Sequence, residues 1–412
     1  MVAALLPGCG GGSASRERAA EGVRHLERAD GLAGDRRLAE AIAAYRQAAA
    51  CLPDDAAVYF YLGNALVRMS WLDEAEQAYQ RALALDPGCA PAHYNLAAAH
   101  IAREQYGAAL EELDQAVALD HGYRLAHLAR GMLLYREGQC EAAAAAFERA
   151  AADTDWAEAR CRLGATYARL NQVGQAVAAY ESALAADSGH AESWAGLGAV
   201  HYQRREYEAA AHALEEALRR EPRLTQAHFT LGNAYMRLGW RELGERHLAE
   251  FTRRQALDKQ IIDVNDAIRQ QPGAARLHYS LGVLYARRGD LTEAEDCYRR
   301  ALARDSVLVA AHGNLGNALL RAGRAGEAMA SFRRALELDS TYALAYNGLG
   351  SVYLVQGQLD PAIEALERAV DLDPDNRELR RNLHSALTLR AGAMQAAAPQ
   401  DTARAPADSA GS

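Results

Sequence analysis

The sequence repeats with a period of 34 residues over most of its length, and this constrains the fold more than any other feature. The segment from Ala56 to Cys89 shows the unit. With Ala56 as position 1, a ring stands at position 4, Leu at 7, Gly at 8, Leu at 11, Ala at 20, a ring at 24, Ala at 27 and Pro at 32. The same template fits from residues 22, 56, 90, 124, 157, 191, 225, 275, 309 and 343. Such a period indicates a stack of similar supersecondary units.

The spacing within the unit predicts a pair of helices. Positions 4, 7, 8 and 11 line one face of a first helix, and positions 20, 24 and 27 line one face of a second. Gly or Ala at positions 8 and 20 lets the two backbones approach closely, while Leu at 7 and the ring at 24 fill the remaining space. A turn is expected at positions 14 to 17, and a proline near position 32 ends the second helix. We expect Asp290 with Glu293, and Ser70 with Asp73, to act as N-caps with an acid at the third helical position.

These residues resemble the tetratricopeptide-repeat (TPR) family, whose signature this pattern is, over about residues 22–376. The resemblance implies an all-α fold, a right-handed superhelical solenoid of antiparallel helix hairpins. We expect ten units and a C-terminal capping helix. One hairpin cannot bury its apolar face alone, so neighbouring hairpins must stack.

The repeat phase also predicts the organisation of the chain. We expect a truncated lipoprotein signal with a Gly/Ser tether in 1–15, units 1–6 with a degenerate first unit in 16–224, an expanded unit with a long helix in 225–274, units 8–10 in 275–376, a capping helix in 377–391 and a disordered tail in 392–412. The expanded unit is 16 residues too long. Residues 240–271 are therefore either one extended helix or two helices with a break.

Composition and motifs exclude several function classes. The net charge of −9 argues against a general nucleic-acid binder. The six cysteines form no CxxC pair, no apolar run reaches the roughly 18 residues of a membrane span, and no GxSxG or phosphate-loop motif occurs. We therefore expect no catalytic residue, metal or cofactor. One histidine per hairpin recurs at position 4, and we interpret these residues as replacing the family's aromatic ring: His25, His93, His127, His228, His278 and His312.

Positions 2, 5, 9, 12 and 13 form a second stripe on each first helix, which in the family lines a concave groove. The resemblance implies a non-enzymatic scaffold that binds a partner protein or peptide there. Arginines at position 13 favour an acidic or extended segment, since arginine pairs with carboxylates, although Glu158 and Glu192 at position 2 can neutralise them. The predicted groove residues are Phe60, Asn64, Arg68, Tyr94, Asn95, Arg136, Arg169, Phe229, Asn233, Arg237, Tyr279, Arg287, Asn314, Asn317 and Arg321.

Two further alternatives stay open on function, and two on location. The first alternative to a scaffold is a structural subunit of a bacterial envelope complex, which would use the outer faces of the solenoid. The second is a regulatory region that acts with a separate enzyme. Leu6, Gly8 and Cys9 resemble the end of a bacterial lipoprotein signal, followed by a Gly/Ser tether. Either the true start lies upstream and Cys9 carries a lipid anchor at the cell envelope, or the match is accidental and the protein is cytoplasmic.

Overall fold

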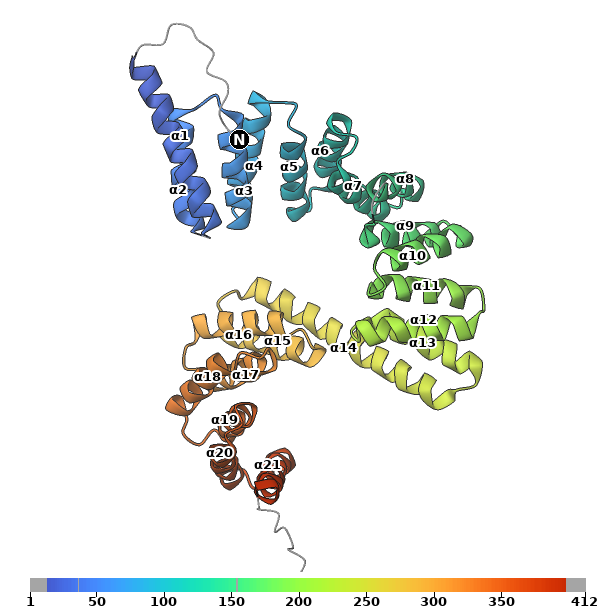
Figure 1. The fold of residues 1–412 in the computed structure, drawn as a ribbon, viewed down its shortest axis with the longest axis vertical. Helices are drawn as coiled ribbons and strands as arrows, with labels where there is room; N and C mark the ends of the chain where they lie inside the picture. Colours follow the sequence, from blue (N-terminus) through green and yellow to red (C-terminus); the bar gives the residue numbers. More distant parts are fainter. Residues whose placement is uncertain (1–12, 36, 153–154, 398–412) are drawn as a thin grey trace, which may run out of the picture. The chain divides into compact units, whose positions relative to one another are not determined.

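The computed structural model describes residues 13–35, 37–152 and 155–397, with side chains from Arg16 to Ala393 apart from these gaps. Over these residues it contains 21 α-helices and no strand (Figure 1). No helix in the described part of the chain combines the length and apolar character that a membrane crossing requires. The predicted all-α class is confirmed.

The helices alternate between first and second members of hairpins. The first helices are α1 (Ser13–Gly34), α3 (Ala56–Arg68), α5 (Ala90–Ala102), α7 (Arg124–Arg136), α9 (Ala157–Arg169), α11 (Ala191–Gln203), α13 (Thr225–Leu238), α15 (Ala275–Arg288), α17 (Val309–Arg321) and α19 (Ala343–Val355), and α21 (Arg377–Ala397) follows the last hairpin. The second helices are α2 (Leu38–Cys51), α4 (Leu72–Leu85), α6 (Tyr106–Leu119), α8 (Cys140–Ala151), α10 (Val173–Ala186), α12 (Tyr207–Arg220), α14 (Arg241–Gln270), α16 (Leu291–Arg304), α18 (Ala325–Leu338) and α20 (Leu359–Leu372).

Contacts divide the chain into two compact units, an N-terminal unit of Met1–Glu245 and a C-terminal unit of Arg246–Ser412. Within each unit, the second helices other than α14 pack on the first helix of their own hairpin and on the next first helix. Most neighbouring first helices also contact one another, whereas no two second helices of the described residues contact as extensively. The first helices therefore line the inner face of each stack.

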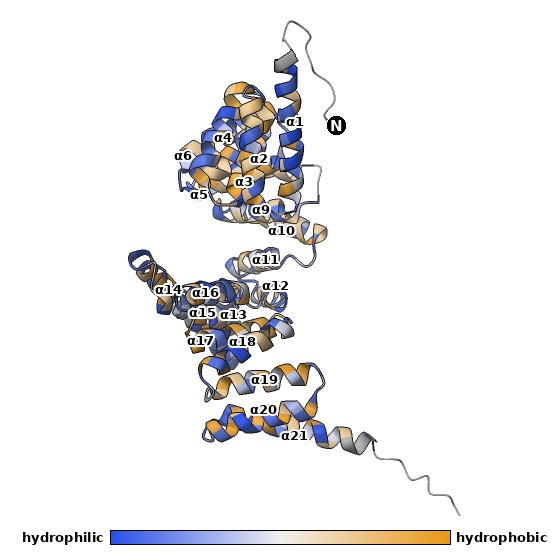
Figure 2. Ribbon diagram, turned by 90° about the vertical axis from the view of Figure 1, so that its left-hand side faces the viewer, coloured by the Kyte–Doolittle hydropathy of each residue, from blue (hydrophilic) through white to orange (hydrophobic). Residues whose placement is uncertain are grey.

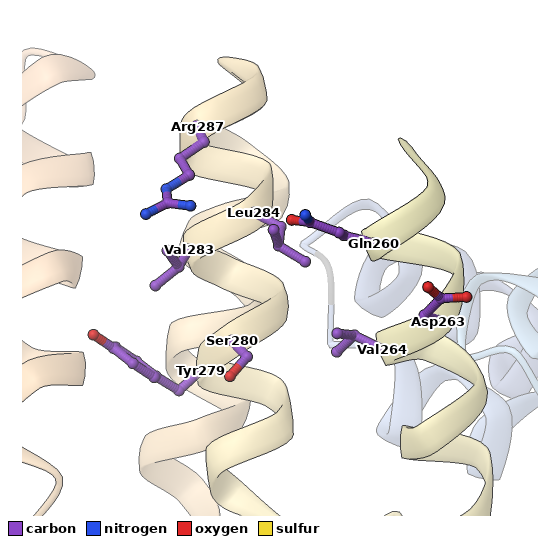
Figure 3. A pocket seen from close by; sticks show the side chains of 8 residues that line it. All are labelled: Gln260, Asp263, Val264, Tyr279, Ser280, Val283, Leu284 and Arg287. Carbon is purple, nitrogen blue, oxygen red and sulfur yellow. The ribbon is translucent and has the colours of Figure 1, made fainter. Parts of the chain in front are cut away.

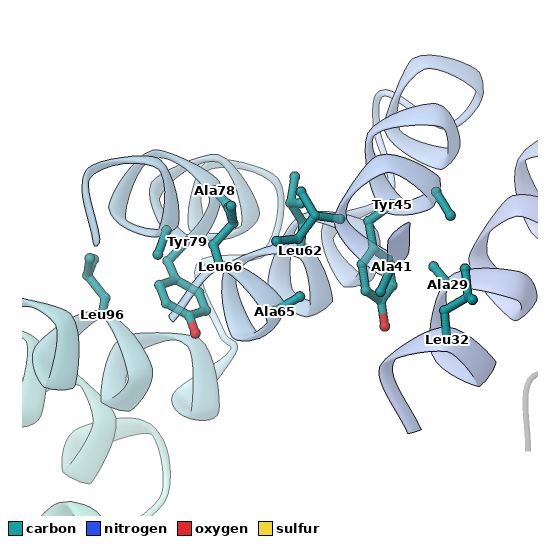
Figure 4. Close-up of a cluster of buried hydrophobic side chains, with 13 residues drawn as sticks. Ala29, Leu32, Ala41, Tyr45, Leu62, Ala65, Leu66, Ala78, Tyr79 and Leu96 are labelled. Atoms are coloured by element: carbon teal, nitrogen blue, oxygen red, sulfur yellow. The ribbon is translucent and has the colours of Figure 1, made fainter. Parts of the chain in front are cut away.

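The core of each hairpin follows the small and large residues of the repeat. In α3 and α4, the ring of Tyr79 covers Gly63 so closely that an added Cβ would lie 2.5 Å from a ring carbon. Figure 4 shows Tyr45 and Tyr79 inserted between neighbouring helices of the first core cluster. Their hydroxyls donate to polar residues of the preceding first helices, Tyr45 to Asp30 at 2.6 Å and Tyr79 to Asn64 at 2.8 Å. Figure 2 shows the resulting amphipathic character, with hydrophobic and hydrophilic stretches on the same helix in α20 and α21.

The turns inside the hairpins correct one of the two predicted caps. Position 15 has a left-handed backbone in nine hairpins, and at Ser70 φ is 61°. Trp71, not Ser70, therefore occupies the N-cap position of α4, and its side chain makes no capping bond. Asp290 does occupy the N-cap position of α16, but makes no side-chain capping bond. Its carboxylate instead accepts a hydrogen bond from Arg288, so neither acid-containing pair forms the predicted cap.

α14 answers the question left open for 240–271, because it is one continuous helix of 30 residues. Its sequence holds two second-helix stretches, 241–254 in the phase of the unit from 225 and 257–270 in the phase that leads into 275. Gln255 and Ala256 join them, at the positions that Asp86 and Pro87 hold in the unit from 56. Both joining residues favour helix and neither breaks it, so the helix runs on.

Both ends of the helical stack extend beyond the predicted boundaries. α1 begins at Ser13, inside the stretch expected to be a tether. α21 continues to Ala397, six residues past the expected end of the cap at 391. The added segment, Gly392 to Ala397, is dominated by alanine with Met and Gln, which are good helix formers.

Candidate functional site

The position-13 arginines sit at the C-terminal ends of first helices, and in the N-terminal unit three of them reach back to the preceding hairpin. Arg68 donates to the carbonyl of Ala33 at 3.1 Å, and Arg169 donates to the carbonyl of Tyr135 at 2.8 Å. The Arg136 guanidinium lies 3.7 Å from the centroid of the Tyr106 ring. These three side chains are already used in contacts between hairpins, where they satisfy helix-end carbonyls or cover a ring.

Most of the predicted asparagines also have hydrogen-bond partners within the protein. Asn95 donates to Asn64 at 2.7 Å, linking α5 to α3, and Asn64 also accepts from Tyr79. Asn233 donates to the carbonyl of Phe229 in its own helix at 2.9 Å. Asn64 and Asn95 thus link neighbouring hairpins, whereas Asn233 is bonded within its own helix. Asn314 likewise donates to the Tyr279 hydroxyl at 3.1 Å, leaving Asn317 as the exposed amide of the predicted set.

The predicted ring contacts are mostly buried. Phe60, Tyr94 and Tyr279 are partly buried against core clusters. Phe229 alone among the four predicted rings is classed as exposed, at 39%. Rings at position 5 therefore contribute chiefly to packing between hairpins.

In the C-terminal unit, by contrast, two position-13 arginines line one hollow. Arg287 and Arg321 are exposed, and neither forms an ion pair or hydrogen bond within the described residues. They border a hollow of about 260 Å³, here called the arginine hollow, together with Asn314 and Asn317. Its remaining lining is Val283, Ala286, Leu291, Tyr298 and Ala318. No carboxylate belongs to this lining, and neither guanidinium group forms an ion pair within the described residues.

Several lining residues of this hollow were not predicted, and the reason is geometric. Val283 and Ala286 lie at positions 9 and 12 of the predicted stripe, so their positions in the repeat were a usable signal. Leu291 and Tyr298 come from the second helix α16, which the stripe did not include. Burial raises the pKa of Tyr298, and its hydroxyl therefore stays protonated at neutral pH.

The acids expected to neutralise the arginines pair with another residue. Arg162 binds Glu158 at 2.6 Å and lies 3.6 Å from Glu192. Glu158 also lies 3.2 Å from His190 Nε2, and Glu158, His190 and Glu192 have the spacing of a metal-ligand set. The guanidinium of Arg162 already compensates both carboxylates, so this cluster is explained without a metal.

Position 4 has a structural role in most hairpins. His93, His127, His228, His278 and His312 place Nε2 between 3.0 and 3.2 Å from the carbonyl six residues earlier. Because a carbonyl only accepts, Nε2 must donate. Trp194 and Tyr59 bond the equivalent carbonyls of Ser188 and Pro53. This agrees with our interpretation that histidine replaces the ring.

Two of the cysteines, Cys161 and Cys297, are buried thiols. Burial raises the pKa of the Cys161 and Cys297 thiols to about 11, so both stay protonated at neutral pH. Cys9, the predicted lipidation residue, lies outside the described residues.

Comparisons with known proteins agree with the repeat. Models described as tetratricopeptide repeat match residues 71–133 and 319–387, residues 273–341, and residues 26–90, 128–191, 161–220 and 196–240. A comparison of the sequence with curated proteins finds no match.

Solved structures resemble parts of the chain. PilF of Pseudomonas aeruginosa is 20% identical with a TM-score of 0.43, covering 48% of this chain and 90% of its own. MamA from Desulfovibrio magneticus is 19% identical with a TM-score of 0.38, covering 41% and 96%. The first TPR of Spaghetti (RPAP3), bound to an HSP90 peptide, is 25% identical with a TM-score of 0.28, covering 29% and 94%.

The repeat models together cover residues 26–240 and 273–387, which is most of the sequence. The helices of the described residues follow the same phase, hairpin by hairpin. The chain belongs to the tetratricopeptide-repeat family, whose repeats serve generally in protein–protein interaction.

Proposed function

We propose that the protein is a non-enzymatic scaffold that binds an acidic, extended segment of a partner protein, and that the arginine hollow of the C-terminal unit is the main binding site. The observation that carries this proposal is the pair Arg287 and Arg321, which border one hollow with no carboxylate in its lining. Guanidinium groups bind carboxylates through paired N–H donors, so such a pair attracts an acidic segment in a protein of negative net charge.

The other lining groups suit a peptide. Asn317 offers an amide that can both donate to and accept from an extended backbone. Val283, Ala286 and Ala318 supply an apolar floor beneath the guanidinium groups. The hollow is small, so we expect it to hold one or two acidic side chains, or a terminal carboxylate, rather than a folded domain.

The test compares two charge-matched double variants. Arg287→Gln with Arg321→Gln removes the proposed contacts, while Arg333→Gln with Arg368→Gln removes two exposed arginines of the second helices α18 and α20. The control pair forms no ion pair or hydrogen bond within the described residues, so the two variants differ in location and not in net charge.

The measurement is the affinity for a partner isolated with the intact chain, and for a synthetic peptide of its most acidic segment. We expect the hollow variant to weaken binding about tenfold to a hundredfold for each arginine that binds a carboxylate, since each charge-assisted hydrogen bond contributes roughly 1.5–3 kcal/mol. Added salt should weaken the wild type more than the hollow variant. Equal binding by both variants would overturn the proposal and favour the structural-subunit alternative.

A further inference from the structure

The second half of α14 is a second helix without its own first helix in the C-terminal unit. In regular hairpins the position-24 ring covers the position-8 glycine of the same hairpin, as Tyr298 covers Gly282 and Phe332 covers Gly316, with an added Cβ 2.6 Å from the ring in each case. In the stretch 257–270, position 24 is Val264. No helix among residues 246–270 precedes this stretch as a separate first helix, because α14 is continuous.

Val264 belongs to a hollow of about 440 Å³ between α14 and α15, here called the α14–α15 hollow. Figure 3 shows Gln260 and Val264 extending from α14 toward α15, and Leu284 and Ser280 on the side of α15 that faces α14. Gln260 stands at position 20, which is Ala in nine units and Gly in the other. The residues that would touch a first helix in a regular hairpin thus line this hollow.

The unpaired side chain of Ser280 is a second, independent observation that favours binding of a helix here. Ser280 is at position 6 of its first helix, and where position 6 is Asn, in three other first helices, the side chain donates to the preceding first helix. Asn95 donates to Asn64, Asn314 donates to Tyr279, and Asn382 of α21 donates to Asn347 of α19 at 2.9 Å. The Ser280 side chain is exposed and forms no hydrogen bond within the described residues.

We propose that the α14–α15 hollow binds an amphipathic helix from a partner protein, which takes the place of the first helix for residues 257–270. The row of first helices supports this proposal. α15 contacts α17 and α17 contacts α19, and a helix bound on the α14-facing side of α15 would extend this row by one member. Like a regular first helix, the partner helix has Leu followed by Gly or Ala, and these two residues face Val264 and Leu284. An Asn or Gln of the partner helix faces Ser280.

Charge defines the partner further. Asp263 lines the hollow, is exposed and forms no ion pair within the described residues. A Lys or Arg of the partner helix is therefore expected beside it, and an acidic residue is expected beside Arg287, which lines the same hollow. This inference goes beyond the proposed function, because it concerns a helix held between α14 and α15, whereas the arginine hollow lies toward α17 and includes Arg321. Arg287 borders both hollows and is left unchanged in the test.

The chain itself supplies a probe with the required pattern. A fluorescent peptide with the sequence of residues 55–69 contains α3, whose Asn64 accepts a bond from position 6 of the next first helix. Isolated helices of this length are marginal in water, so the peptide carries Ala57→Glu and Tyr61→Lys, whose side chains are joined by a lactam bridge; both positions are exposed in the protein. A control peptide carries Leu62→Asp, which destroys the apolar face.

Binding to the full chain is measured by fluorescence anisotropy. Ser280→Trp and Gln260→Trp block the hollow from its two sides, and both alter exposed residues. Ser340→Trp makes the same change in an exposed turn outside the hollow, and Arg321→Gln alters only the arginine hollow. We expect both blocking variants to weaken binding by about tenfold or more, with Ser340→Trp and Arg321→Gln close to the wild type.

Unchanged binding in both blocking variants, or equal binding of the Leu62→Asp peptide, would overturn the inference. A loss in Arg321→Gln as large as in Ser280→Trp would assign the peptide to the arginine hollow and would overturn it as well. Dimerisation of the wild type that Ser280→Trp abolishes, seen by sedimentation, would replace the partner helix by a second copy of the chain. Circular dichroism of each variant checks that the fold is retained.

Discussion

The two units carry the same repeat, but they use equivalent positions differently. At position 13, Arg68, Arg136 and Arg169 of the N-terminal unit contact the preceding hairpin. Arg237 of the same unit is exposed and forms no hydrogen bond or ion pair within the described residues, and Arg287 and Arg321 of the C-terminal unit border one hollow without such a partner. A shared residue at a shared position therefore does not imply a shared role. In the first case the guanidinium completes the stack, and in the second it is available to a ligand.

The turns inside the hairpins differ between the units as well. Position 15 of the C-terminal unit is always glycine, at Gly289, Gly323 and Gly357. In the N-terminal unit the same left-handed backbone is held by other residues in four hairpins: Ser70, Glu104, Asn171 and Arg205. Residues with a Cβ are strained in this conformation, so the N-terminal unit has turns that can still be stabilised.

The largest expected effect tests whether the units unfold separately. Ala301→Trp in α16 overfills a fully buried position-27 site and should cost the C-terminal unit about 1–3 kcal/mol. Ala217→Trp in α12 is the matched change in the N-terminal unit. Hydrogen exchange should show lost protection chiefly in the unit that carries the substitution. Equal loss in both units would show that α14 couples them, and an unchanged midpoint for Ala301→Trp would refute the repeat phase there.

Next in size is the turn at position 15. Gly323→Ala should destabilise the C-terminal unit by about 1–2 kcal/mol, because φ at this residue is 77°. Arg205→Gly, at a φ of 64°, should stabilise the N-terminal unit by about 0.5–1 kcal/mol after the added freedom of the unfolded chain is counted. Urea unfolding measures both changes. The two substitutions should change the free energy of unfolding in opposite directions. A loss of stability in Arg205→Gly would contradict the role given to the left-handed turns.

The comparison of arginines predicts a difference of similar size. Arg136→Gln with Arg169→Gln removes a cation–π contact and a hydrogen bond to a helix-end carbonyl, and should lower the free energy of unfolding by about 1–2 kcal/mol. Arg287→Gln with Arg321→Gln should leave it nearly unchanged. Similar stability losses in the two double variants would show that the C-terminal arginines are structural too, and would weaken the binding proposal.

The smallest effect concerns pH in the N-terminal unit. Burial is the main cause that lowers the pKa of His127 below its ordinary 6.5, and its Nδ1 atom is buried without a partner. Neutral His127 therefore contributes stability above pH 6.5, and this contribution is lost as pH falls through the lowered pKa. His127→Tyr keeps a donor for the carbonyl of His121, as Tyr59 does for Pro53. As pH falls, the melting temperature of this variant should decrease less than that of the wild type. An identical decrease would exclude His127 as a cause.

The repeat pattern predicted most of the helices because its key contacts lie within one hairpin. A glycine at position 8 and a ring at position 24 are meaningful only if two helices cross there, and Gly316 with Phe332 does so in the structure. Cap prediction was less successful, because Ser70 lies in a turn whose left-handed backbone moves the helix start by one residue. The phase shift after 225 revealed an irregular unit, but left its form open.

The sequence alone determined the hairpin, its period and the stripe of residues on each first helix, since these depend on spacing along one chain segment. Tertiary structure decided which of those residues are available. Whether a guanidinium meets a carbonyl or stays uncompensated depends on the neighbouring hairpin, as Arg169 and Arg321 show. The same holds for the α14–α15 hollow, because only the structure shows that two second-helix stretches form one continuous helix and that Val264 and Ser280 line a hollow beside it.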